Sequence, residues 1–385
     1  MYDEKICRYT LNRIFGYRPK IAHALVESIG SASEVFRIGS TRLKEMLPYT
    51  KGICLLSDRE YEKSYIELKR LEAAGIRFIC NDDAFFPALL KECEDHPMGL
   101  YVRSESPFRE IFTECTNIAV IGTRDISPYG REWCERIVSS LPGTSPETAV
   151  ISGLAIGTDI TAHRTALKKG VRTIAVIPTG IDGIYPYRHL SEAERIASSP
   201  GCAIVTDYPP QTKALKINFL RRNRIIAGLC RATILVESKV KGGGMTTARL
   251  AFSYSRDVYA LPGRADDIRS QGCNLLIKEK IAEPIFSEQA LLESLSLQKA
   301  IESDRNDAYG KDTFTKMYSE TLDSSSIDIL SRIVLAIKSR RGITIEETAQ
   351  TLGISYRQTS ELVCLLECDG IISTDLMQRC FIKLQ

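Results

Sequence analysis

Residues 116–124, TNIAVIGTR, hold the pattern that decides the fold of this 385-residue chain. An apolar, β-branched run leads directly into Gly-Thr-Arg, which is typical of a buried strand that ends in a loop. Five similar runs follow, most of them separated by amphipathic helical segments: Ala149–Ile151, Thr173–Ile177, Ala203–Thr206, Thr233–Val236 and Val258–Leu261. Strands that alternate with helices predict an α/β fold with a Rossmann-like, doubly wound parallel sheet.

The predicted strands end in loops that suit a phosphate ligand. In doubly wound sheets, ligands bind at the carboxyl ends of the strands, where the strand order reverses. Glycines, hydroxyl groups and basic side chains gather at these ends: Gly122, Thr123 and Arg124 after the first strand, Ser152 and Gly153 after the second, and Lys239, Lys241 and GGGMTT at 242–247 after the fifth. A glycine run that opens a helix supplies N–H donors to an anion. GxGxxG is missing after the first strand and GxxxxGK[ST] from the whole chain, so no dinucleotide or ATP cofactor is expected.

A cluster of cations is expected at the start of a helix in residues 218–229, NFLRRNRIIAGL. The start of a helix carries the positive end of its dipole, so cations there predict a negative partner. Arg221 and Arg224 share one side, whereas Arg222 lies on the apolar side, from which its stem can carry the guanidinium past the helix end. Carboxylates inside the fold could pair with any one of the three. Because residues 211–231 contain no acidic side chain, a phosphate ligand is favoured for the three together.

Two polar pairs could support chemistry but are expected to be structural. Asp159 and His163 are one helical turn apart and could act as an acid–base pair. No Ser or Cys nucleophile is identifiable beside them, so we expect them to orient each other and the preceding loop. Asp182 and Tyr185, which follow the third predicted strand, are expected to shape their own loop.

Cysteine usage argues against a metal site. The chain has twelve cysteines and four histidines. Most cysteines lie in apolar contexts, and we expect them to be buried free thiols. Examples are Cys54, Cys80, Cys202, Cys230 and Cys364. Cys364 and Cys368 are one helical turn apart, but no second pair of ligands lies near them in the sequence, so no zinc site is expected.

Composition limits the possible partners. A net charge of +3 does not describe a polycation, so nucleic-acid binding would need a local basic patch. The N-terminal sequence has no apolar run suited to a signal peptide, and no run of about 18 apolar residues predicts a membrane span. We therefore expect a cytoplasmic protein that does not bind a membrane.

The length of the chain predicts several domains. We expect a helical domain at 1–80, similar to SAM or helix-hairpin-helix domains, a Rossmann-like domain at 81–295, a linker at 296–325 and a winged helix at 326–385. A helix-hairpin-helix could grip a DNA backbone, but the dispersed charges of the first segment favour a structural role. In the last segment seven basic and seven acidic residues cancel, so a winged helix that contacts protein is at least as well supported as one that binds DNA.

These motifs, in this order and spacing, resemble one family, the DNA-processing protein A family, also called Smf. The resemblance rests on IGTR at 121–124, SGLAIGTDITAH at 152–163, FLRRNRIIAGL at 219–229, GGGMTTARLA at 242–251, LPG at 261–263 and GCNLLI at 272–277. It implies a protein without enzymatic activity, cofactor or metal that binds single-stranded DNA without sequence preference. It further implies a homodimer that helps to load RecA recombinase onto the strand during natural transformation and recombination.

The resemblance also implies which residues contact DNA. Arg124 would hold a backbone phosphate, Phe219 could stack a base, and the threonines and glycines at 243–247 could hold a second phosphate. Cationic grooves with aromatic platforms are typical of sequence-tolerant binding to single strands. The implied DNA-binding set is Gly122, Thr123, Arg124, Ser152, Gly153, Lys216, Phe219, Arg221, Arg222, Asn223, Arg224, Gly243, Gly244, Thr246 and Thr247.

Two other functions compete with this interpretation. Nucleotide phosphoribohydrolases, which hydrolyse nucleoside monophosphates, share a Rossmann-like fold. The sequence of their glycine–threonine loop resembles PGGxGTxxE. Here Thr247 is followed by Ala248, Arg249, Leu250 and Ala251, so the glutamate of that motif is missing. A transcription factor would rely on the tail, but its presumed recognition helix sets Arg357 against Glu361 and Glu367, which disfavours duplex binding.

Overall fold

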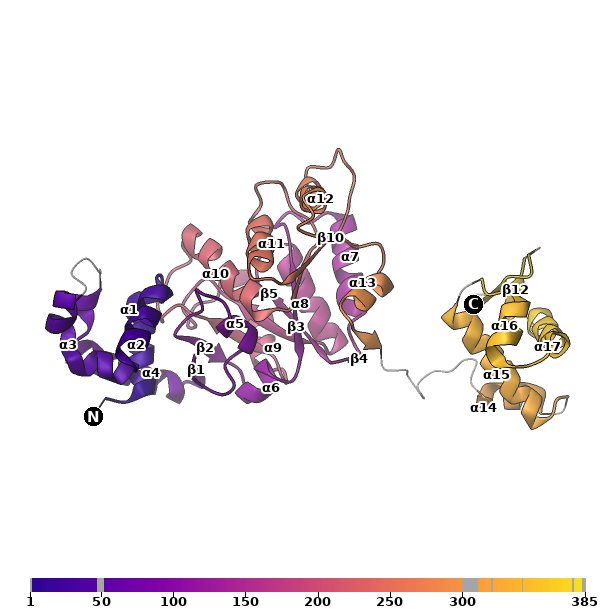
Figure 1. Cartoon of the computed structure of the whole chain (residues 1–385), viewed down its shortest axis with the longest axis horizontal. Helices are drawn as coiled ribbons and strands as arrows, with labels where there is room; N and C mark the ends of the chain where they lie inside the picture. The colour runs from indigo at the N-terminus through magenta and orange to yellow at the C-terminus, as the bar shows by residue number, and fades with distance from the viewer. Residues whose placement is uncertain are drawn as a thin grey trace. The chain divides into compact units, whose positions relative to one another are not determined.

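The computed structural model describes residues 2–46, 52–299, 311–319, 321–340, 342–375 and 377–382 (Figure 1). The chain divides into two compact units, residues 1–300 and residues 301–385. Each unit has hydrophobic clusters of its own.

A nine-stranded sheet forms the middle of the first unit, in the order β1-β2-β7-β6-β5-β3-β8-β9-β10. Its strands are β1 Ile76–Cys80, β2 Gly99–Arg103, β3 Thr116–Ile121, β5 Thr148–Ser152, β6 Arg172–Val176, β7 Ala203–Thr206, β8 Ala232–Leu235, β9 Asp257–Ala260 and β10 Glu283–Pro284. Every neighbouring pair from β7 to β10 is parallel, whereas β1 and β2 pair antiparallel and β2 runs antiparallel to β7. The six apolar runs found in the sequence are six of the parallel strands, so the predicted α/β class and parallel sheet are confirmed.

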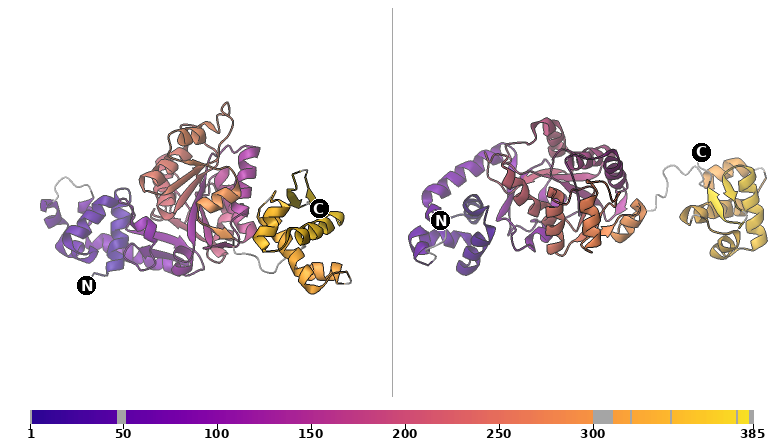
Figure 2. Two further views of the ribbon diagram at one scale, coloured as in Figure 1. Left: turned by 45° about the vertical axis from the view of Figure 1, so that its right-hand side comes forward. Right: turned by 90° about the horizontal axis from the view of Figure 1, so that it is seen from above.

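Helices cover both faces of this sheet (Figure 2). Along β3, Ile118 and Val120 face one core cluster while Ala119 and Ile121 face another, because successive strand residues point to opposite sides. One face packs on α10 Lys216–Leu229, α11 Gly243–Ser253 and α12 Gln271–Lys278, and the other on α7 Pro128–Ser139, α8 Thr158–Lys169 and α13 Glu288–Ser294. Burial on both faces explains why the strands are almost continuously apolar.

The strand order reverses at β3. From β3 the chain passes through α7 to β5 on one side, while β8 lies on the other side of β3 and leads through α11 to β9. Because the loops after β3 and β8 therefore turn away from each other, a crevice opens at the carboxyl ends of these two strands.

The N-terminal helices pack on the antiparallel edge of the sheet. They are α1 Glu4–Phe15, α2 Pro19–Ile29, α3 Ala32–Met46 and α4 Asp58–Ala73. Tyr9 of α1 makes edge-to-face contacts with Phe78 of β1 and Tyr101 of β2, with ring centroids 4.9 and 5.5 Å apart. The expected helical segment 1–80 therefore ends too late, because residues 76–80 form a strand of the sheet.

Short elements complete the first unit. They are η1 Ile53–Leu55, α5 Ala88–Lys91, α6 Phe108–Phe112, β4 Thr144–Ser145, η2 Tyr187–His189, α9 Leu190–Ser198 and β11 Gln298–Lys299, which pairs antiparallel with β4.

The second unit consists of helices and one hairpin. Its elements are α14 Lys311–Tyr318, α15 Ser324–Ser339, α16 Ile345–Leu352, α17 Tyr356–Cys368, β12 Ile372–Thr374 and β13 Cys380–Ile382. A capping box formed by Thr344 and Glu347 opens α16, and the Ser355 hydroxyl accepts from the Gln358 amide at the start of α17. The expected linker 296–325 contains α14, whose Phe314 is buried against α15, whereas residues 300–310 lie outside the described residues. The winged-helix assignment stays a prediction.

The cysteines are free thiols, but not all of them are buried. Cys80, Cys202 and Cys230 are buried as expected, whereas Cys54 and Cys364 are exposed, so the expectation was wrong for these two. Cys364 lies on the outer side of α17, and Cys54 lies in a short 3-10 turn. Within the described ranges, no cluster of three or more acidic, histidine or cysteine side chains could hold a metal ion. None of the helices described has the length and apolar content needed to cross a bilayer.

A buried ion pair fixes α10 to the rest of the fold. The Arg224 guanidinium pairs with the Asp207 carboxylate just after β7, and the two side chains are only 11% and 5% exposed. Arg224 Nη1 also donates to the carbonyl oxygen of Asp95. A carboxylate within the fold is therefore the partner of this arginine.

Replacing Arg224 with Met should lower the free energy of unfolding by about 3–5 kcal/mol, because it leaves the buried Asp207 carboxylate without a counter-charge. Urea denaturation would measure the change. The double variant Arg224→Met/Asp207→Asn should recover much of the loss. A single variant as stable as the wild type would contradict the importance of this pair.

His163 is held inside the unit in its neutral form. Its Nδ1 lies 2.8 Å from the Thr173 hydroxyl, which itself donates to the carbonyl oxygen of Val150. Burial lowers the pKa of His163 from 6.5 to about 3. The folded protein therefore excludes a proton that the unfolded chain takes up below about pH 6.5.

This difference predicts a specific loss of stability in acid. The stability linked to His163 is complete above pH 6.5 and falls as the pH drops toward 3, by about 2 kcal/mol at pH 5. Urea denaturation at pH 7.5 and pH 5 should therefore show a larger loss for the wild type than for His163→Gln. Equal losses in the two proteins would mean that His163 takes up a proton as readily in the folded state as in the unfolded chain.

Candidate nucleic-acid interface

A cleft of about 590 Å³ occupies the crevice at the carboxyl ends of β3 and β8. Its walls are the loops after these two strands, the start of α11 and one face of α10. The cleft lies where the strand order reverses, as expected from the sequence. Ten of the residues predicted to contact DNA line it: Gly122, Thr123, Arg124, Lys216, Phe219, Arg222, Asn223, Gly243, Gly244 and Thr247.

The arginines of α10 diverge because the helix begins earlier than expected. Lys216 is its first residue, so Arg221, Arg222 and Arg224 lie beyond the first turn, and of these cations only Lys216 lies at the positive end of the helix dipole. At about 100° per residue, α10 has three faces. One lines the cleft, one packs into the core, and one meets the N-terminal part of the unit.

Arg222 points into the protein and not past the end of the helix as expected. Its side chain is buried, and its Nη1 donates to the carbonyl oxygen of Val176 at 2.7 Å. The guanidinium passes beneath the loop after β5, where a Cβ on Gly153 would lie only 1.8 Å from Nη1. Burial lowers the pKa of Arg222 to about 10, and the nearby Asp159 carboxylate opposes this effect. At neutral pH a positive charge therefore lies beneath the cleft.

Ser152 and Gly153 support the cleft without lining it. The buried Ser152 hydroxyl donates to the carbonyl oxygen of Val120, which ties β5 to β3. The Asp159 carboxylate accepts from the amides of Gly153 and Ala155 at 3.1 and 3.4 Å. The expectation that Asp159 orients this loop is confirmed, whereas His163 bonds to Thr173 and not to Asp159.

Three other predicted residues lie outside the cleft. The Arg221 guanidinium carbon lies 4.7 Å from the ring centroid of Tyr17, and Arg224 is paired with Asp207. Thr246 lines a separate shallow hollow beside Arg249 on the outer side of α11. Thr246 and Thr247 separate in this way because neighbouring helix residues point about 100° apart.

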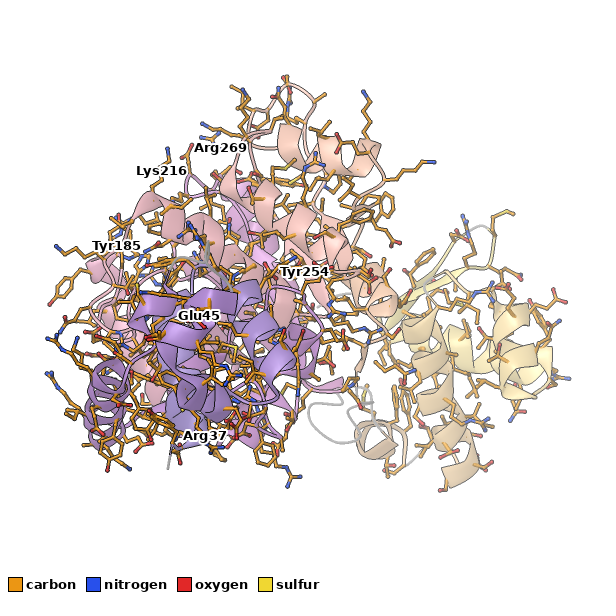
Figure 3. All side chains as sticks on the ribbon, turned by 60° about the vertical axis from the view of Figure 1, so that its left-hand side comes forward. Arg37, Glu45, Tyr185, Lys216, Tyr254 and Arg269 are labelled. Atoms are coloured by element: carbon orange, nitrogen blue, oxygen red, sulfur yellow. The ribbon has the colours of Figure 1, made fainter. Side chains whose placement is uncertain are left out.

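Phe219 lies at the centre of the cleft wall between two partners. The Arg124 guanidinium carbon lies 4.9 Å from the Phe219 ring centroid. The ring of Tyr185 meets Phe219 edge to face, with centroids 5.5 Å apart and an interplanar angle of 76°. Tyr185 is 44% exposed and lines the cleft. Figure 3 labels Tyr185 and Lys216, which belong to the same wall.

Sequence reasoning assigned Tyr185 to loop architecture only. The signal that could have identified it was an aromatic residue in the loop after β6, at the same edge of the sheet as the other motifs. Two lysines singled out in the sequence but left out of the DNA-binding set, Lys239 and Lys241, also line the cleft.

The cleft is strongly basic. Five basic side chains and one acidic side chain are among its lining residues: Arg124, Lys216, Arg222, Lys239, Lys241 and Asp159. None of the side chains that the structure describes caps the start of α11, where Gly243 and Gly244 bring the first backbone N–H groups to the cleft. An anion here would meet both the helix dipole and exposed ammonium groups.

The loop that carries Arg124 is held in place before any ligand binds. The Thr158 amide donates to the carbonyl oxygen of Thr123 at 3.1 Å. After Arg124, the Ser127 amide donates to the buried Glu237 carboxylate at 2.9 Å, and Arg269 pairs with Asp125. The backbone of this wall is therefore preorganised, while the Arg124 side chain is exposed and can move.

The chain resembles known proteins in sequence and in structure. The chain is 36% identical to Protein Smf of Synechocystis sp. over 242 residues, which cover 60% of each chain. It is 36% identical to DNA processing protein DprA of Streptococcus pneumoniae over 197 residues, 51% of this chain and 67% of that protein. The chain thus spans less than two thirds of the Synechocystis relative.

Two solved structures resemble the fold. The X-ray structure of DprA from Streptococcus pneumoniae matches with a TM-score of 0.62 and 27% identity, covering 76% of this chain and 96% of that one. DNA processing protein A from Helicobacter pylori, a structure described for its single-stranded DNA binding mode, matches with a TM-score of 0.51 and 28% identity, covering 57% and 95%. Residues 77–296, more than half of the chain, match the family described as DNA recombination-mediator protein A, and the chain belongs to this family.

Proposed function

We propose that this chain binds single-stranded DNA without sequence preference in the cleft between β3 and β8. The observation that carries the proposal is the arrangement around Phe219, an aromatic ring set among Arg124, Lys216 and the start of α11. Base stacking on aromatic rings tolerates every sequence, and a basic groove follows the backbone that all sequences share. The Helicobacter pylori relative, whose structure was described for its binding of single-stranded DNA, supports this ligand.

When DNA binds, a base would replace the Arg124 guanidinium as the partner of the Phe219 ring. In the free protein the Arg124 guanidinium covers the ring, at a distance that leaves no room for a base between them. A base that stacks on Phe219 therefore displaces Arg124, which is then free to pair with a backbone phosphate. Lys216 on one side and Lys239, Lys241 and the α11 amides on the other would hold further phosphates.

The physiological role that we propose is delivery of the bound strand to RecA recombinase during natural transformation or other recombination, by a homodimer of this chain in the cytoplasm. Membership of a family of recombination mediators supports this role. Many weak phosphate contacts suit handover, because they can be released one at a time. No bond is made or broken in this mechanism.

A nucleotide phosphoribohydrolase is the alternative function. Such an enzyme needs a carboxylate free to act on the nucleotide. Of the acidic residues that the structure describes, Asp159 is the one that lines the cleft, and its carboxylate is occupied by two backbone amides. Incubation with nucleoside monophosphates would test this alternative, because release of a free base would establish the enzymatic function in place of DNA binding.

Arg124→Ala should weaken binding to labelled oligo-dT about tenfold, because it removes a phosphate contact. The slope of log Kd against log salt concentration should fall by about 0.7. Fluorescence anisotropy at several salt concentrations measures both quantities. Arg357→Ala is the matched control, because Arg357 is 90% exposed and paired with Glu361 in the second unit. Equal effects of the two variants would contradict the assignment of the cleft.

Recombinase loading provides a second test. The purified chain should accelerate RecA assembly on circular single-stranded DNA coated with a single-strand-binding protein, measured as DNA-dependent ATP hydrolysis. Lys216→Glu should abolish the acceleration, because it places a negative charge at the exposed first turn of α10. If Lys216→Glu accelerated RecA assembly as much as the wild type does, recombinase loading would not depend on the cleft. Light scattering after size exclusion would test the proposed homodimer.

A further inference from the structure

Tyr17 and Arg221 form an exposed aromatic and cationic pair outside the cleft. The Arg221 guanidinium carbon lies 4.7 Å from the Tyr17 ring centroid. Tyr17 is 46% exposed and Arg221 is also exposed. The two residues come from different parts of the unit, Tyr17 from the turn after α1 and Arg221 from α10. The pair repeats the combination of Phe219 and Arg124 in the cleft.

Contacts beneath Tyr17 hold this pair in a fixed place. The Tyr17 ring packs on the ring of Tyr208, with centroids 5.6 Å apart. Tyr208 is itself buried, and its hydroxyl donates to the carbonyl oxygen of Asn218 in α10 at 3.2 Å. Asn12 of α1 donates from its side-chain amide to the carbonyl oxygen of Asp207 at 2.9 Å. The turn after α1 is therefore joined to the base of α10.

The part of α10 between the cleft and this pair is apolar and contributes no negative charge. Leu220, next to Arg221 in the sequence, lines the cleft and is 43% exposed, and Ile217 on the same side as Arg221 is 46% exposed. Residues 211–231 contain no acidic side chain. The nearby Asp207 carboxylate is buried and paired with Arg224. A strand that leaves Phe219 over this ridge would meet apolar side chains and then Tyr17.

We propose that Tyr17 and Arg221 form a second base-stacking subsite, which extends the path of single-stranded DNA from the cleft, over α10, to the N-terminal helices. The proposal rests on the proposed binding of single-stranded DNA in the cleft. Tyr17 supplies a ring with a buried support on one side, and Arg221 supplies a guanidinium that can leave the ring and pair with a phosphate. A short oligonucleotide occupies only the cleft, whereas a longer one also reaches Tyr17.

The test is a length series of oligo-dT from about 4 to about 16 nucleotides, the range of site sizes for single-strand-binding modules. Anisotropy would compare the wild type with Tyr17→Leu, Tyr17→Phe and Arg221→Gln. Arg231→Gln is the control for loss of charge, because Arg231 is exposed but precedes β8, at the opposite ends of the parallel strands from the cleft. Circular dichroism melting would show that each variant is folded.

We expect Tyr17→Leu and Arg221→Gln to bind the shortest oligonucleotides as the wild type does and to lose about tenfold in affinity for the longest ones. Tyr17→Phe and Arg231→Gln should keep the wild-type affinity at all lengths. In addition, 2-aminopurine placed along the longest oligonucleotide should be quenched at one position by the wild type and not by Tyr17→Leu.

Other results would overturn the subsite. Wild-type affinity of Tyr17→Leu at every length would mean that the strand does not reach Tyr17. A loss of equal size at every length would mean that Tyr17 only supports the cleft through α10. Failure of the proposed function gives a different result, because the wild type itself would then bind no oligonucleotide of any length.

Discussion

The buried guanidinium of Arg222 is the interaction on which the geometry of the cleft depends. It donates to the Val176 carbonyl oxygen and so joins α10 to the end of β6. Its positive charge is balanced by the Asp159 carboxylate of α8. This anchor sets the rotation of α10 about its axis. Lys216 and Phe219 reach the cleft because Arg222 is turned inward. The absence of a side chain at Gly153 is what makes room for it.

Much of the central fold could be predicted because its signals are local. Each parallel strand is buried on both faces, so each appears in the sequence as a short β-branched run, and the loops at the strand ends carry the glycines that turns need. The N-terminal boundary was placed wrongly because Ile76–Cys80 is a strand whose partners, Gly99–Arg103, follow a connector without regular periodicity. Helix α14 was missed because its sequence is short and polar.

The position of the candidate site was predictable, but the roles of its arginines were not. Arg124 follows a strand directly, so its place at the carboxyl edge of the sheet depends on local sequence alone. The partners of Arg222 and Arg224 are Val176, at the end of β6, and Asp207, just after β7. Both partners are distant in the sequence, so no local pattern could show that these two charges are paired inside the fold. The direction in which each side chain of α10 points is set by where the helix begins, and that start was expected two residues too late.

Strands β1 and β2 give the parallel sheet a protected border. Without them, β7 would be the outermost strand on that side, with a row of unpaired backbone groups able to recruit a strand from another molecule. With them, the outermost strand is β1, and the Tyr9 ring of α1 packs on the rings of Phe78 and Tyr101 on this pair of strands. The region that matches the family begins at residue 77, within β1, so it includes β1 and β2 together with the parallel strands. A fragment that started at β3 would keep the strands and loops that form the cleft, but it would expose the edge of β7 to aggregation. The smallest fragment expected to stay monodisperse therefore includes β1, β2 and the N-terminal helices.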